Sequence, residues 1–99
     1  MSVVNDNEAR CRFELVVDGT SAFASYRREG HQIIFTHTVV PKTLEGRGIG
    51  KRLIAGAFEL VRADGLKVIP ACPFVLHYFE THPEEQSLLA TSVENRGQT

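Results

Sequence analysis

Several features that would mark a secreted or membrane protein are missing from this chain. It has no tryptophan and two cysteines, Cys11 and Cys72, which are too few for the disulfide framework of a small secreted domain. No apolar run approaches the roughly 20 residues of a membrane helix, and no secretory signal precedes the first alternating segment. We therefore expect a cytoplasmic protein with reduced thiols and no membrane partner.

The remaining composition is that of an ordinary globular protein, with 42% hydrophobic and 23% charged residues among 99. A chain of this length has room for one domain and one small site. We expect that domain over residues 10–90, as a monomer or weak dimer, with a flexible arm at 1–9 and a flexible tail at 91–99.

Positive charge is concentrated in residues 42–52, where four basic residues and one acidic residue give +3 in a chain whose net charge is -1. A nucleic-acid-binding surface usually spreads more basic residues over a larger face, with aromatic residues between them. We therefore expect no nucleic-acid partner.

Apolar residues alternate from Arg12, and the turn pairs Asp18-Gly19 and Glu29-Gly30 divide the alternating segments. This pattern predicts three antiparallel strands in a meander, with the second strand at 21–28 and a longer third strand at 31–40. The meander is the β part of an α+β fold.

The period then changes from 2 to 3.6, which predicts an amphipathic helix of about four turns that ends at Asp64-Gly65. A short strand at 66–69 should pair parallel with the long strand, since a strand, a helix and a strand in this order make a right-handed crossover. Pro73 is suited to the first position of a second helix, which should end near Thr81. Residues 84–90 would add one short turn or helix.

A glycine-rich turn, Glu45-Gly46-Arg47-Gly48-Ile49-Gly50-Lys51, opens the longer predicted helix. A helix start offers unpaired N–H groups and the positive end of the helix dipole, and glycines let the backbone approach an anion closely. The turn therefore predicts a phosphate site. Glu45 stands where a P-loop has its first glycine, and Lys51 where a dinucleotide fingerprint has its third, so neither ATP nor NAD fits.

The turn resembles motif A of the GNAT superfamily of acyl-CoA-dependent N-acetyltransferases, with Gly48 and Gly50 at its two small positions and Glu45 in place of Gln or Arg. Three blocks in order are similar to the minimal GNAT-like family of about a hundred residues: His37-Thr38-Val39-Val40-Pro41, the glycine-rich turn, and Pro70-Ala71-Cys72-Pro73-Phe74. The resemblance implies a small GNAT-like fold in which the strands at 31–40 and 66–70 splay apart around the pantetheine arm.

It also implies that coenzyme A and acetyl-CoA bind here, without a metal. Backbone groups of Val39 and Val40 would pair with pantetheine, and N–H groups of residues 47–51 would hold the pyrophosphate. Lys42, Arg47 and Arg52 would hold the 3′-phosphoadenosine end. The full expected binding set is Val39, Val40, Glu45, Gly46, Arg47, Gly48, Ile49, Gly50, Lys51, Arg52, Phe74 and Tyr78.

Cys72 and His37 are the candidate catalytic residues. Cys72 lies between a predicted parallel strand and a helix start, where the helix dipole favours a reactive thiolate, and the matching cysteine of the minimal family is expected beside the thioester. Alternation places His37 on the face of Ile33 and Phe35, where it would act as a general base. Each of these residues also has a purely structural reading, as a small buried hydrophobe and a packing histidine.

Other side chains are less informative. Tyr78 is either a proton donor to the leaving thiolate or a core residue. His77 is five residues from Cys72 and from His82, which is not the i, i+4 spacing of a helical zinc site, so no metal is expected.

Three functions follow in order of preference. The first is transfer of an acetyl group from acetyl-CoA to an amine, either directly or through Cys72, with an open acceptor side. The second is a non-catalytic CoA-binding module, such as a sensor or carrier, and the third is a thiol redox protein. The identity of the amine does not follow from the sequence.

Overall fold

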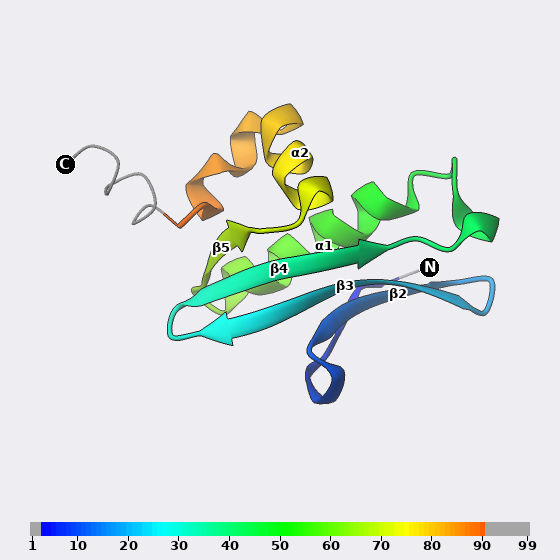
Figure 1. Cartoon of the computed structure of the whole chain (residues 1–99), viewed down its shortest axis with the longest axis horizontal. Coiled ribbons are helices and arrows are strands. Elements are labelled where there is room, and N and C mark those ends of the chain that lie inside the picture. The colour runs from blue at the N-terminus through cyan, green and yellow to red at the C-terminus, as the bar shows by residue number, and fades with distance from the viewer. Residues whose placement is uncertain (1–2, 91–99) are drawn as a thin grey trace.

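A computed structural model describes residues 3–90 and contains one sheet whose five strands lie in chain order, β1-β2-β3-β4-β5. Neighbouring strands pair antiparallel up to β4, and β4 pairs parallel with β5. The strands are β1 (Asn5–Asn7), β2 (Arg12–Val17), β3 (Thr20–Glu29), β4 (Gln32–Val39) and β5 (Lys67–Pro70), and the helices are α1 (Ile49–Ala63) and α2 (Pro73–Thr81). Short 3-10 turns occur at η1 (Glu8–Arg10), η2 (Lys42–Leu44) and η3 (Pro83–Leu88). The predicted α+β fold, its meander, its parallel strand and both helices are confirmed (Figure 1).

Aromatic side chains connect the sheet to both helices in one core. Phe35 of β4 contacts Phe58 of α1 edge-on at 5.8 Å between ring centroids, and Phe58 in turn contacts Phe79 of α2 at 5.0 Å. All three side chains are almost fully buried, and they belong to a single cluster of buried residues. Both helices therefore pack on the same face of the sheet as Phe35, and their positions are fixed relative to β4.

Where the sequence predicted a flexible arm over residues 1–9, the structure has the strand β1 followed by the start of η1, and residues 1–2 lie outside the described residues. Asn5–Asn7 pairs with β2 as an edge strand, the hydroxyl of Tyr26 donates to Asp6 Oδ1 at 2.6 Å, and Val4 packs against Gly56 of α1. The prediction failed because an edge strand can be held by backbone hydrogen bonds, which leave no alternating apolar pattern. The predicted tail at 91–99 lies outside the described residues.

A β-bulge in β4 decides which side chains face the helices. Tyr26 of β3 is opposite Phe35, but Ser25 is opposite His37, so Thr36 has no counterpart and the alternation reverses after it. Thr38 is thereby brought onto the core face with Ala24, while His37 is exposed on the opposite face of the sheet. The predicted orientation of His37, on the face of Phe35, is wrong.

The parallel strands β4 and β5 separate after Phe35, which is also where the bulge in β4 begins. Their pairing ends at Phe35 opposite Pro70, after which β4 continues to Val39 while the chain following β5 turns into α2. The end of β4 and the start of α2 therefore bound a gap in the sheet, as Figure 1 shows. Within residues 3–90, no helix has both the length and the apolar character to span a membrane.

Candidate functional site

A hollow of about 750 Å³ lies where β4, the glycine-rich turn and α2 meet. Thr38 and Val40 reach it from the end of β4. The chain from η2 to the first turn of α1 forms one wall, and a face of α2 forms the other. Its wall residues are Leu44, Glu45, Gly46, Gly48, Ile49, Gly50 and Lys51 on one side, and Phe74, His77, Tyr78, Thr81 and His82 on the other.

The glycine-rich turn adopts a backbone that needs glycine at two positions. Gly46 and Gly48 have φ angles of 81° and 71°, in the left-handed region that other residues seldom adopt. Gly48 is the N-cap of α1, and no side chain caps this helix start. The first turn of α1 therefore opens toward the hollow with its N–H groups available to an anion.

Gly50 is small for a different reason. It lies within α1, and a Cβ built on it would be only 2.5 Å from Cζ of the Phe74 ring, whereas a Cβ at Gly46 or Gly48 would meet nothing within 4 Å. The absence of a side chain at Gly50 therefore allows the Phe74 ring of α2 to pack against the first turn of α1. The space at Gly46 and Gly48 is open, as a phosphate cradle requires.

Cys72 lies at the N-cap of α2 and is 4% exposed. Its Sγ is 3.4 Å from Oγ1 of Thr38, and Thr38 lines the hollow, whereas Cys72 itself is not one of the wall residues. Pro73 occupies the first position of α2, and the Cys72 side chain before it lies against Thr38 of β4. The thiol is thus one side chain away from the hollow, at the point where β4 and β5 part.

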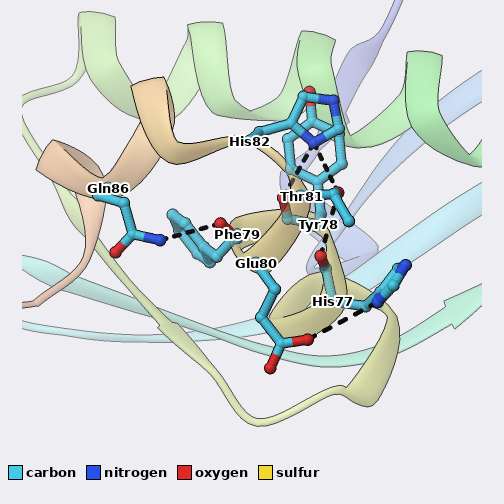
Figure 2. Close-up of polar contacts among 7 residues, drawn as sticks. All are labelled: His77, Tyr78, Phe79, Glu80, Thr81, His82 and Gln86. Carbon is cyan, nitrogen blue, oxygen red and sulfur yellow. Dashed lines mark hydrogen bonds and ion pairs between the residues drawn. The ribbon is translucent and has the colours of Figure 1, made fainter.

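The α2 wall carries an ordered polar group that sequence reasoning missed (Figure 2). The rings of Tyr78 and His82 stack with centroids 3.9 Å apart and planes 11° from parallel. His82 Nδ1 is 2.9 Å from the Tyr78 carbonyl oxygen and 3.0 Å from Thr81 Oγ1. On the neighbouring turn, His77 Nδ1 lies 3.7 Å from a Glu80 carboxylate oxygen.

The spacing of these α2 residues in the sequence could have revealed the polar group. Positions 74, 77, 78, 81 and 82 repeat at i, i+3, i+4, i+7 and i+8, which places them along one helix face. Burial raises the pKa of Tyr78, and Glu85 and Glu84 raise it further, so its hydroxyl keeps its proton well into the alkaline range.

The structure brings most of the predicted binding residues to the hollow, but not all of them. Arg47 forms an exposed ion pair with Asp18 at 3.1 Å, and Arg52 lines a separate, smaller hollow near Val4. Val39 is 41% exposed and lies, with His37, on the face of the sheet away from the helices. The residues from the predicted set that do line the hollow are Val40, Glu45, Gly46, Gly48, Ile49, Gly50, Lys51, Phe74 and Tyr78. Within residues 3–90, no group of three or more His, Cys, Asp or Glu side chains is arranged to hold a metal ion.

Comparison with known proteins agrees with this geometry. The model of the family described as GCN5-related N-acetyl-transferase matches residues 12–88. Among solved structures, the NMR solution structure of a GCN5-like candidate N-acetyltransferase from Staphylococcus aureus superposes with a TM-score of 0.69 and 29% sequence identity. The match covers 88% of this chain and 86% of that one. No curated protein has a sequence that matches this chain.

Proposed function

Because the chain belongs to the GCN5-related N-acetyltransferase family, whose activity is acetyl transfer, we propose that it moves the acetyl group of acetyl-CoA to an amine. The observation that carries the proposal is the glycine-rich turn, which opens α1 directly onto the 750 Å³ hollow. We further propose that the domain works in the cytoplasm with reduced thiols, as a monomer or weak dimer.

The residues at the turn fit a phosphorylated ligand. Space is open above Gly46 and Gly48, no side chain caps the start of α1, and Lys51 adds a cation to the wall. We propose that the N–H groups of this turn hold the pyrophosphate of coenzyme A, and that the backbone of Val40 pairs with the pantetheine amides. Glu45 lines the same wall, and its carboxylate would repel a phosphate, so we assign the anion to the N–H groups beyond it.

The gap between β4 and β5 is the proposed place of the thioester, which supplies an activated acetyl group. Two routes fit the residues there. In the direct route the amine nitrogen bonds to the thioester carbonyl carbon, the C–S bond breaks with release of the CoA thiolate, and the proton that the amine loses passes to water. In the second route the Cys72 thiolate forms the new bond first, which releases the CoA thiolate, and the amine then displaces Cys72 from its acetyl group.

Tyr78 is a proposed contact for the bound coenzyme A, and the departing thiolate takes its proton from water. Tyr78 lines the hollow, and burial raises the pKa of its hydroxyl. A backbone N–H near Val40 would polarise the carbonyl oxygen as charge develops on it. His37, on the opposite face of the sheet, has no part in this proposal.

The test is a calorimetric titration with CoA and acetyl-CoA, with ATP and NAD as controls, followed by an assay of thiol release in the presence of amines. We expect CoA and acetyl-CoA to bind and the two controls to bind at least tenfold more weakly. No CoA binding at near-millimolar concentration would overturn the proposal. If the protein binds acetyl-CoA but releases no CoA thiol in the presence of any amine, its function would be that of a non-catalytic CoA-binding module.

A further inference from the structure

The nucleoside end of the ligand needs a site that the predicted basic residues do not provide. Arg47 is paired with Asp18 at the β2–β3 turn, and Arg52 lines the hollow near Val4, on another side of α1. Lys42 is exposed in η2 and does not line the main hollow. Across that hollow from the glycine-rich turn, however, α2 presents the stacked rings of Tyr78 and His82.

These rings form a fixed platform. The Tyr78 carbonyl oxygen can only accept a hydrogen bond, so His82 Nδ1, at 2.9 Å, must carry the proton and donate to it. This hydrogen bond places a proton on Nδ1 and fixes the plane of the His82 ring. Tyr78 covers one face of that ring, and Phe58 supports Tyr78 edge-on at 5.4 Å between ring centroids. The side chain of His82 therefore reaches the hollow with its rotamer already chosen.

The position of His82 along α2 separates it from the reacting end of the hollow. Cys72 is the N-cap of α2 and His82 is its C-cap, so the two residues lie at opposite ends of the helix. The His82 ring, stacked on that of Tyr78, therefore lies toward the C-terminal end of the α2 wall, away from Cys72 and Thr38. A ligand whose phosphates rest on the turn would have its nucleoside within reach of this end.

We propose that the Tyr78–His82 pair is a purine subsite, on which the adenine of coenzyme A stacks against the imidazole of His82. The proposal rests on the proposed function and assigns to this wall the nucleoside that the basic residues were expected to hold. Purines stack on aromatic side chains through their π-faces, and a ring whose orientation is already fixed loses little conformational freedom on binding. Thr81 acts as a positioning residue, since its hydroxyl lies 3.0 Å from His82 Nδ1.

The test compares CoA with 4′-phosphopantetheine, which keeps the thiol arm and one phosphate but lacks the adenosine. Calorimetry on the wild-type protein should show tighter binding of CoA. His82→Ala should weaken CoA binding about tenfold, the range measured for loss of one base-stacking side chain, and leave 4′-phosphopantetheine binding unchanged. His82→Phe, which keeps a stacking ring, should retain at least part of the preference for CoA.

The control is His31→Ala, at an exposed position in the β3–β4 turn, which should change neither affinity. Equal weakening of both ligands by His82→Ala, or equal binding of both ligands by the wild-type protein, would overturn the purine subsite and leave the proposed function standing. If the wild-type protein binds neither ligand, the proposed function fails as well. If His82→Ala does not fold, the same two ligands are compared on His82→Phe and His82→Gln. A His82→Gln variant that still binds CoA more tightly than 4′-phosphopantetheine, to the same degree as the wild-type protein, would overturn the proposal.

Discussion

Thr38 Oγ1 lies 3.4 Å from Cys72 Sγ, and this contact joins the end of β4 to the start of α2 across the gap between the parallel strands. The bulge at Thr36 is what turns Thr38 toward Cys72, because without it the side chain would project from the other face of the sheet. A single extra residue in β4 therefore places a hydroxyl beside the Cys72 thiol at the proposed thioester site.

Cys72 offers the first prediction. If the reaction passes through its thiol, incubation with acetyl-CoA should add one acetyl group to Cys72, visible by mass spectrometry, and Cys72→Ala should lower the rate of amine acetylation by about a hundredfold or more. Cys11→Ser is the matched control, since Cys11 is exposed and lies beside Tyr26 of β3, on the other side of β4 from this gap, and should affect neither result. An unmodified Cys72 together with a fully active Cys72→Ala variant would assign the direct route.

The contact between Gly50 and Phe74 leads to a second prediction. Gly50→Ala places a Cβ where the ring tip of Phe74 lies, so the ring must move, and we expect it to move into the hollow and weaken CoA binding by about tenfold. The double variant Gly50→Ala/Phe74→Ala should bind more tightly than Gly50→Ala alone, because the colliding ring is gone. Glu59→Ala, at an exposed position later in α1, is the control for a general effect on the helix.

Calorimetric titration of the four proteins measures this directly. If Gly50→Ala binds CoA as tightly as the wild-type protein does, the Phe74 ring moves away from the ligand. A double variant no better than Gly50→Ala would mean that the added methyl group, and not Phe74, obstructs binding.

Much of this architecture could be predicted from the sequence, since turn pairs and apolar periods are local signals. Asp18-Gly19 does close the β2–β3 hairpin, and Gly65, with φ of 70°, does follow the end of α1. The bulge at Thr36 could not be predicted, because it depends on the register between β3 and β4, and nothing in residues 32–39 themselves marks the extra residue. Strict alternation therefore assigned His37 to the wrong face.

The basic residues near the turn show a second limit of the sequence. Their count correctly indicated a positive loop, but successive residues on a helix differ by about 100° in direction, so Lys51 lines the hollow while Arg52 does not. The direction of Arg47 is decided by Asp18, which is 29 residues earlier in the chain. Charge counts thus indicated the segment that lines the hollow, but not which of its side chains face it.

His37 provides a third prediction, which follows from its place on the outer face of the sheet. His37→Ala should leave the acetyl-transfer rate, its pH profile and the affinity for CoA within about twofold of the wild-type protein. Surface substitutions away from a site usually cost less than 0.5 kcal/mol of stability, so the thermal midpoint should also change little. A tenfold loss of rate with a changed pH profile would restore His37 as a general base.

The fourth prediction concerns alkaline stability and the edge strand β1. Tyr26 donates to Asp6 Oδ1 at 2.6 Å, and burial, followed by this carboxylate, raises the pKa of Tyr26 well above the usual 10.0. The folded state thus holds the tyrosine proton more tightly than the unfolded chain does. The stability gained from this is complete below pH 10 and is lost as the pH rises beyond it, because the unfolded chain then ionises first.

Tyr26→Phe should cost about 1–2 kcal/mol at pH 7, by loss of the hydrogen bond, and should flatten the fall in stability above pH 10. Urea unfolding between pH 7 and 11.5 measures both effects, with Tyr78→Phe as the control for the other tyrosine, whose pKa is also raised but which does not contact β1. Identical slopes for Tyr26→Phe and the wild-type protein above pH 10 would contradict the assignment of the alkaline loss to Tyr26.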